Sequence, residues 1–388
     1  MRIHLGLTTL FLLVPACLGC TGEEVEMEVS STEGTPVRIG DEPRLRVGTV
    51  SGDTIRELYR VRTPFLMPDG RLVVPLAGAG ELRVFDEKGE FVKTLGGAGE
   101  GPGEFTGLSS AWSQGDTIEA YDGRLRRFTR FLPGGSVQVV TLAGSGTAES
   151  APAGAVPEGW VTTGVAGGEH PGRDLIAVNR FTPEGDELEE IGRVEGMHRA
   201  GTGPHPLSPR AVVRVGDGSV HWGETLAPRI SVWNPEEGSR RQITWTPPTP
   251  TASPGDAMSL VRDSLAAREE AGLSTGPWTR LVQEAQAPER LSVFWDFMVD
   301  ELGFLWIQPY DPANHAFALG GLEGGSYVMG GSSSGGRWLI LSPDGTEAGS
   351  VQVPEGLRLT HITRDAVVGI RLNEIDVETV EVRSLERH

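Results

Sequence analysis

The sequence predicts an all-β fold in which one four-stranded antiparallel unit recurs six times. Three observations lead to this prediction. The 388 residues include 54 glycines and 27 prolines, a composition typical of many short strands joined by tight turns. Two short patterns alternate along the chain, and both contain apolar runs with the period of a strand. At 38% hydrophobic residues, the chain can also bury a large core.

The first pattern is a short polar turn followed by an apolar or aromatic run, and it begins at residues 69, 115, 158, 217, 302 and 365. The second pattern is a hairpin with Gly at its centre, and it covers residues 84–95, 131–142, 181–192, 232–245, 341–353 and, in a less regular form, 377–385. Each unit is therefore a meander of four strands. One such sheet cannot bury both of its faces, whereas several around an axis can, which predicts a six-bladed β-propeller.

The N-terminal residues of the domain are expected to close this ring. The sixth unit holds three strands only, at residues 359–363, 366–372 and 378–385. Residues 44–50 form a strand without a partner ahead of the first unit. We therefore expect this strand to complete the last blade and to tie down both ends of a domain that spans residues 41–388.

Two segments carry a resemblance to a known family. The loop Leu95–Phe105, with the sequence LGGAGEGPGEF, resembles the corresponding loop of NHL-like six-bladed β-propellers. Residues 365–382 resemble the last blade of bacterial six-bladed propeller lipoproteins. The resemblance covers roughly residues 44–386. It implies this architecture and a binding role, but no reaction, since fold alone does not give function.

Two insertions interrupt the strand pattern. Residues 253–288 predict a helical hairpin between blades 4 and 5, because Ser253 can cap a helix and Pro254 suits its first turn. This hairpin is either a lid over the central funnel or a packing element over a sheet edge. Residues 312–337, inside blade 5, are rich in Gly and Ser and form a long loop that is either functional or disordered.

The N-terminus predicts export. Arg2 precedes an apolar run that is too short to span a bilayer and fits a signal peptide over residues 1–19. Gly19-Cys20 resembles a bacterial lipobox, which makes Cys20 the expected lipid acceptor, with Cys17 as a rival. An ordinary cleaved signal is the alternative, and it would give a secreted protein. Residues 20–40 are acidic and are expected to form a flexible tether. We therefore expect a protein held at the cell envelope by lipid, facing the periplasm or the outside.

The net charge of −19 argues against nucleic-acid binding and against docking on anionic lipid, so the anchor would be the one membrane contact. Two G-x-S-x-G matches, at 272–276 and 331–335, lack the strand and helix that a nucleophile elbow requires. We therefore assign no catalytic residue. No histidine pair has metal-ligand spacing, and no cofactor is expected, although a divalent metal held by residues from several blades stays open.

The residues to examine in the central funnel are those expected on the innermost strands, together with two carboxylates: Glu119, His221, Trp222, Glu224, Trp306 and His361. For each of them, an ordinary packing role in the core or at the rim is the competing interpretation. The function predicted from the sequence is a binding or scaffold module, with a protein or small-molecule ligand at one face of the ring. A metal-dependent propeller hydrolase, lactonase or lyase is one alternative, and a structural subunit of an envelope complex is another.

Overall fold

The chain divides into two compact units, Met1–Thr32 and Glu33–His388. The computed structural model describes residues 37–49, 54–143, 151–166, 172–200, 203–270, 272, 275–315, 335–372 and 377–387, all of them in the second unit. No helix among these residues is long and apolar enough to cross a membrane. The predicted signal peptide, most of the tether and both cysteines lie outside the described residues.

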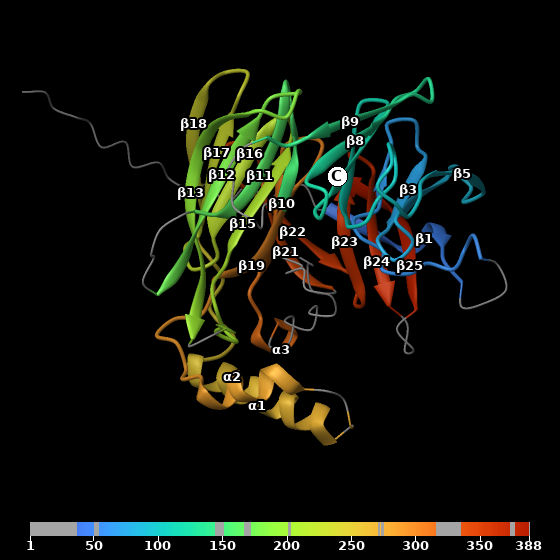
Figure 1. The fold of residues 1–388 in the computed structure, drawn as a ribbon. Coiled ribbons are helices and arrows are strands. Elements are labelled where there is room, and N and C mark those ends of the chain that lie inside the picture. Colours follow the sequence, from blue (N-terminus) through green and yellow to red (C-terminus); the bar gives the residue numbers. More distant parts are fainter. Residues whose placement is uncertain are drawn as a thin grey trace, which may run out of the picture. The chain divides into compact units, whose positions relative to one another are not determined.

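Six antiparallel sheets make up the second unit and follow one another along the chain as blades 1 to 6, which confirms the predicted six-bladed fold (Figure 1). Blade 1 contains β2 (Phe65–Leu66), β3 (Leu72–Leu76), β4 (Glu81–Phe85) and β5 (Phe91–Gly96). Blade 2 contains β6 (Leu108–Gln114), β7 (Thr117–Asp122), β8 (Arg127–Phe131) and β9 (Val137–Thr141). Blade 3 contains β10 (Ala151–Val156), β11 (Gly159–Val165), β12 (Arg173–Phe181), β13 (Glu187–Ala200) and β14 (Gly203–Pro204). Blade 4 contains β15 (Ala211–Gly216), β16 (Ser219–Glu224), β17 (Arg229–Asn234) and β18 (Ser239–Thr244). Blade 5 contains β19 (Phe294–Val299), β20 (Leu305–Pro309), β21 (Gly336–Leu341) and β22 (Glu347–Val353). Blade 6 contains β23 (Leu357–Ile362), β24 (Ala366–Leu372), β25 (Glu378–Arg387) and β1 (Val37–Val47). The two-residue β14 is an addition to the four strands expected of blade 3.

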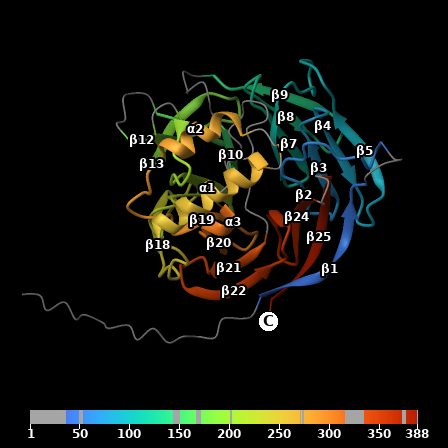
Figure 2. The same ribbon diagram turned by 90° about the horizontal axis from the view of Figure 1, so that it is seen from below.

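The first strand of each blade lies at the centre of the ring. These inner strands are β2, β6, β10, β15, β19 and β23; they contact one another in that order, and β23 also contacts β2. Figure 2 views the ring along its central axis and shows the blades as successive sectors. The strands at the opposite edge of each sheet form the rim, and β5, for example, has no buried residue.

Apolar side chains fill every interface between neighbouring blades. Six separate clusters of buried residues occur, one for each pair of successive blades. Along β15, Ala211 and Val213 belong to the cluster between blades 3 and 4, whereas Val212 belongs to the cluster between blades 4 and 5. The period of two therefore gives each blade one apolar face toward each neighbour.

The strand β1 is the outer strand of blade 6. It pairs antiparallel with β25, from Val37 opposite Arg387 to Val47 opposite Val380. It begins four residues ahead of the domain start expected at residue 41, and it ends before the expected limit at residue 50. Blade 6 thus combines the first and the last strands of the unit, and no edge of the sheet faces a gap in the ring.

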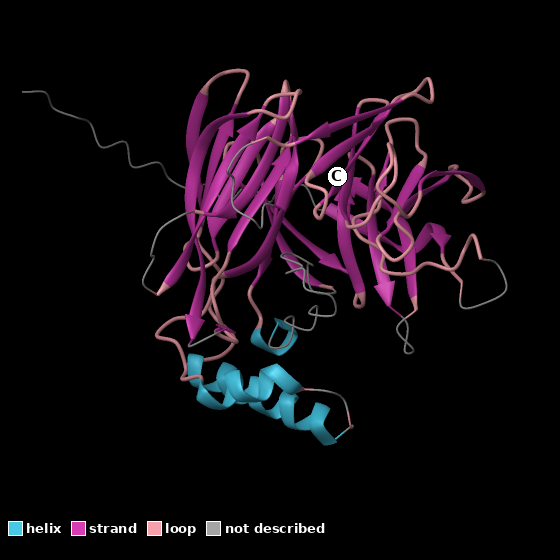
Figure 3. Cartoon of the chain, in the orientation of Figure 1, coloured by secondary structure: helices cyan, strands magenta, loops and turns pink. Residues whose placement is uncertain are grey.

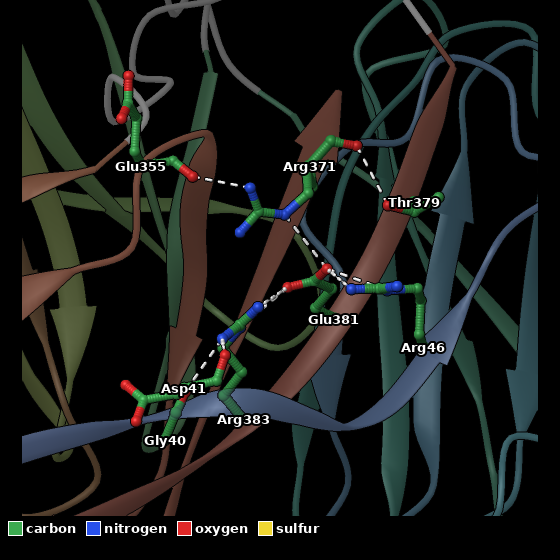
Figure 4. A network of polar contacts seen from close by, with 8 residues as sticks. All are labelled: Gly40, Asp41, Arg46, Glu355, Arg371, Thr379, Glu381 and Arg383. Atoms are coloured by element: carbon green, nitrogen blue, oxygen red, sulfur yellow. Dashed lines mark hydrogen bonds and ion pairs between the residues drawn. The ribbon is translucent and has the colours of Figure 1, made fainter. Parts of the chain in front are cut away.

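One buried carboxylate stabilises this pairing (Figure 4). The side chain of Glu381 is fully buried and forms ion pairs of 2.7 Å with Arg46 of β1 and with Arg383 of β25. Arg371 of β24 lies 3.2 Å from the same carboxylate, and it also donates to Glu355 O. Burial would raise the pKa of Glu381, but the hydrogen bonds and charges of these arginines outweigh it, so the net shift is downward. Glu381 therefore stays ionised and links three strands.

The two faces of the ring differ. Blades 1 to 5 each have four principal strands, so the chain enters and leaves each of these blades at the same face. This face also carries α1 (Pro254–Glu270), α2 (Gly276–Glu284) and α3 (Pro312–His315), and we call it the helix-bearing face (Figure 3). The opposite hairpin face carries tight turns, such as those at residues 86–90 and 342–346. Val37, which pairs with Arg387, lies on the hairpin face.

The helical hairpin predicted between blades 4 and 5 is confirmed as α1 and α2. Ser253 and Asp256 form a reciprocal cap, since Asp256 N donates to Ser253 Oγ and Ser253 N donates to Asp256 Oδ2, both at 3.2 Å. Met258 and Val261 of α1 pack with Val282 of α2. Figure 2 shows both helices over the side of blades 3 to 5. No described helix covers blades 1, 2 and 6.

The glycine-rich loop after β5 links blades 1 and 2. Arg127 of β8 donates to the carbonyl oxygens of Glu100, Gly101 and Glu104 at 2.7–2.8 Å. Phe105, at the end of the loop, is buried in the interface of blades 1 and 2. The loop that carries the family resemblance therefore holds two blades together, and its backbone carbonyls are already engaged.

Candidate functional site

The six candidate residues from the sequence do not converge on one site. His361 lies on the inner strand β23, whereas the others lie on second strands. Those strands are β7 for Glu119, β16 for His221, Trp222 and Glu224, and β20 for Trp306. The expectation of an innermost strand is thus wrong for His221, Trp222 and Trp306 and correct for His361. The polar turn that precedes each aromatic run joins the first strand of a blade to the second, and does not open the blade.

Glu119 joins blades 2 and 3. Its carboxylate is fully buried and accepts Trp112 Nε1 at 3.0 Å and Trp160 Nε1 at 2.8 Å. Arg130 Nε donates to its other oxygen at 2.9 Å, and the guanidinium lies 4.4 Å from the Trp160 ring centroid. Both oxygens are engaged within the interface, so this carboxylate has a structural role.

Trp222 is buried in the interface of blades 3 and 4, and His221, the preceding residue of β16, is buried on the opposite side of the strand. His221 is 2% exposed, and burial, with a smaller effect of the Arg241 charge, lowers its pKa to about 4. Its imidazole is therefore neutral at pH 7, and Nδ1 has no hydrogen-bond partner among the described residues. Trp222 packs against Gly192 of blade 3, where an added Cβ would lie 2.8 Å from the indole. The two residues are part of the core.

Trp306 and Glu224 are also engaged. Trp306 is fully buried in blade 5 and donates from Nε1 to Asp300 Oδ2 at 2.9 Å. Glu224, at the end of β16, forms a 2.7 Å ion pair with Arg173 of blade 3. Each contact joins secondary structure elements that the fold brings together, and neither leaves a group directed at a ligand.

His361 is the one candidate at the centre of the ring. Leu66 N donates to its Nδ1 at 3.3 Å, so the ring links blades 6 and 1. Burial lowers its pKa to about 4. The described residues contain no group of three or more His, Cys, Asp or Glu side chains placed to hold a metal ion.

A groove of about 660 Å³ lies between the outer parts of blades 1 and 2. Leu95, Phe131 and Val137 supply much of its apolar wall. Its charged residues include Arg71, which is paired with Asp69 at 2.7 Å. The groove lies at the rim, away from the inner strands, and its lining also includes Lys93, Glu104 and Asp116.

The inner strands differ from this groove, because half-buried arginines lie on them or just before them. At blades 4 and 5, Arg210 donates from Nε to Trp295 O at 3.1 Å, and its guanidinium lies 3.6 Å from the Trp295 ring centroid. Burial lowers the pKa of Arg210 to about 10. Arg214 binds both oxygens of the buried Asp296 at 2.7 and 2.8 Å. Both arginines also line a small cavity of about 70 Å³ between blades 3 and 4.

An aromatic stack backs this cluster. The His315 ring lies parallel to Trp295, with 4.5 Å between centroids, and next to Tyr310 at 5.4 Å. Burial, helped by the Arg210 charge, lowers the pKa of His315 to about 3. Burial raises the pKa of Tyr310 to about 12. Both side chains are therefore neutral near pH 7, so Arg210 contributes a positive charge that this stack does not offset.

Two further half-buried arginines, Arg62 and Arg358, belong to blades 1 and 6. Neither forms an ion pair with a described residue, in contrast to Arg214 and the three arginines around Glu381. Sequence reasoning missed all four arginines on or before the inner strands. Arginine at the start of an apolar run carries no pattern of its own, and the pairing of inner strands that brings these residues together is not visible along the chain.

The comparisons with known proteins agree with this architecture. A family model described as a 6-bladed beta-propeller matches residues 58–131, which correspond to most of blades 1 and 2 and the loop between them. A member of the DUF4221 family from Bacteroides vulgatus has a similar fold, with a TM-score of 0.53 and 10% identity over 92% of this chain and 100% of that chain. The chain is a six-bladed β-propeller. No curated protein matches its sequence.

Weaker likenesses concern two enzymes. Virginiamycin B lyase from Staphylococcus aureus gives a TM-score of 0.41 at 10% identity, over 90% of this chain and 99% of that chain. A gluconolactonase from Xanthomonas campestris gives 0.39 at 13% identity, over 91% and 99%. At these scores, neither likeness supports an argument about the activity of this chain.

Proposed function

We propose that the protein is an exported, lipid-anchored binding module that holds its ligand at the channel mouth on the helix-bearing face. The observation that carries the proposal is electrostatic. The chain has a net charge of −19, yet Arg62, just before β2, and Arg358 of β23 are half-buried and form no ion pair with a described residue. Cations concentrated in an otherwise acidic protein favour an anionic ligand there.

An exposed aromatic side chain on the same face supports the proposal. Tyr59 precedes blade 1, is 69% exposed and lies beside Gly78, in the turn between β3 and β4. Aromatic side chains on a rigid scaffold are common at binding surfaces because they bury a large area with few rotatable bonds. The lipid at Cys20 and the acidic tether would join the ring through Val37, which lies on the hairpin face.

Site-specific photo-cross-linking in the native envelope tests the binding face. A benzoylphenylalanine at Tyr59 probes the helix-bearing face, and the same residue at Phe91 is the matched control, since Phe91 is 37% exposed next to a turn of the hairpin face. We expect a discrete cross-linked product from position 59 and none from position 91. A product from position 91 alone would overturn the assignment of the face.

The anchor is tested separately with serine variants. Cys20→Ser is expected to release the protein from the membrane fraction, whereas Cys17→Ser leaves it bound. Release by Cys17→Ser alone would move the lipid to Cys17, and no release by either variant would exclude a lipid anchor at these cysteines.

A further inference from the structure

Blades 6 and 1 meet at the centre of the ring through their inner strands. Thr360 Oγ1 of β23 donates to Pro64 O at 2.7 Å, and Leu66 N donates to His361 Nδ1 at 3.3 Å. Both segments start at the helix-bearing face and run toward the hairpin face. Arg358 lies two residues before Thr360, and Arg62 lies two residues before Pro64. Both arginines are therefore nearer to the helix-bearing face than this contact is.

The strand period places Arg358 on the side of β23 that faces blade 1. Leu357 and Leu359 pack into the interface of blades 5 and 6, so the residues between and after them have the opposite orientation. The contact of Thr360 with Pro64 agrees with this. Arg62 and Arg358 are close enough for the charge of Arg358 to act on Arg62, which lies in the adjoining segment of blade 1.

Both guanidinium groups are half-buried without an ion pair among the described residues. Burial, and then the charges of Arg60 and Arg358, lower the pKa of Arg62. Burial also lowers the pKa of Arg358. Arg62 Nε is buried and has no hydrogen-bond partner in the described part of the chain. A cation removed from water without a partner is unfavourable unless something else supplies the missing interactions.

One carboxylate lies near, and the backbone already occupies it. Glu378 Oε2 accepts Val61 N at 2.8 Å, and Glu378 also accepts the backbone N–H of Arg60. Burial raises the pKa of Glu378 in spite of these hydrogen bonds and of the nearby arginine charges. Among the described residues, the charges of Arg62 and Arg358 thus lie near a single carboxylate, which the backbone already engages.

We propose that Arg62 and Arg358 form a binding site for an oxyanion, a carboxylate or phosphate group of the ligand held at the channel mouth. This inference rests on the proposed function and deepens it by naming the chemical class of the ligand. The guanidinium presents a planar set of N–H donors that fits two oxygens of such a group. Two guanidiniums from adjoining blades can hold one anion from both sides.

Calorimetric titration of the purified full-length protein with inorganic phosphate, and separately with acetate, tests the site at constant ionic strength. We expect saturable binding of at least one anion, and its affinity falls at least tenfold in Arg62→Gln/Arg358→Gln. A response to phosphate alone identifies a phosphate group, and a response to acetate alone a carboxylate. The control Arg71→Gln alters an arginine paired with Asp69 near the hairpin face and should bind as the parent does.

Arg62→Lys keeps the charge but loses the planar donors, so it should weaken binding several-fold and serves if the double variant does not fold. The absence of binding by the parent protein, or equal binding by the parent and both arginine variants, would overturn the site. The cross-linking result at Tyr59 is independent of these titrations. A failure of the anion site is therefore distinguishable from a failure of the binding face.

Discussion

Two glutamates on one strand, Glu378 and Glu381 of β25, stand in opposite surroundings. Glu381 is fully buried and contacts three guanidinium groups, and its pKa is lowered. Glu378 contacts backbone N–H groups while Arg62 and Arg358 lie nearby unpaired, and burial raises its pKa. In the first arrangement, all three arginines contact the carboxylate directly, and the contacts link the strands that close the ring. The second leaves cations exposed to a ligand, which is how a binding site differs from a structural ion network.

The largest expected effect comes from exchanging the two glutamates for glutamine. Glu381→Gln leaves three arginines around a neutral amide, and it should lower the free energy of unfolding by about 3–5 kcal/mol. Burial already favours the neutral form of Glu378. Glu378→Gln should therefore lower the free energy of unfolding by less than about 1 kcal/mol. Urea denaturation of both variants measures the difference. Equal losses would contradict the separation of the two sites.

The arginines give the second comparison. Arg383 is 5% exposed and donates to both Glu381 and Gly40 O, so Arg383→Gln should cost about 2–4 kcal/mol of the free energy of unfolding. Arg358→Gln removes a half-buried cation that has no ion pair, and it should change this free energy by less than about 1 kcal/mol in either direction. Thermal unfolding of the two variants, without added phosphate, provides the measurement. A strongly destabilised Arg358→Gln would mean that its charge is needed for folding.

A third effect concerns pH and the buried His221. Its pKa is about 4 in the folded protein, lowered by burial from the ordinary value of 6.5. Between these values the unfolded chain binds a proton that the folded protein does not, so the stability from neutral His221 is present above pH 6.5 and is lost as pH falls toward 4. From pH 7 to pH 5 this loss is about 2 kcal/mol. Urea denaturation at pH 7 and pH 5 measures this loss in the free energy of unfolding. In His221→Gln the loss should be smaller by about 2 kcal/mol, whereas a loss equal to that of the parent protein would exclude His221 as the cause.

The smallest effect is expected at the exposed side of the Glu381 network. The Arg46 side chain is 53% exposed although it lies 2.7 Å from Glu381. Solvent screens such a pair, so Arg46→Gln should reduce the free energy of unfolding by about 0.5 kcal/mol. This variant, measured beside Arg383→Gln, shows whether burial or the mere number of contacts sets the strength of the network. A loss as large as that of Arg383→Gln would favour the number of contacts.

The ring was predictable from the sequence because its signals are local. Each polar turn and Gly hairpin sets the position of two strands, and their recurrence reveals the blades. The cap at Ser253 and the helices after it follow from equally local rules. The strand that pairs with β25 was expected to start at Arg44, yet β1 starts at Val37. The early start was missed because the residues between Ile39 and Leu45 are polar, Gly or Pro and show no apolar alternation.

The site was not predictable in the same way. Trp222 and His221 were candidates because tryptophan and histidine are common in binding sites, but the fold buries both side chains. Arg62 and Arg358 are separated by most of the chain and become neighbours only when the last blade meets the first. Their significance depends on the absence of ion pairs to described residues around them, which only three-dimensional contacts reveal.

Arginine side-chain NMR during a phosphate titration tests the central claim most directly. The Nε–H signals of Arg62 and Arg358 can be assigned with their glutamine variants, and those of Arg371 and Arg383 in the same way. The account predicts saturable shifts for Arg62 and Arg358, while Arg371 and Arg383, held by Glu381, keep their positions. Equal shifts for all four arginines, or shifts confined to the Glu381 network, would contradict it.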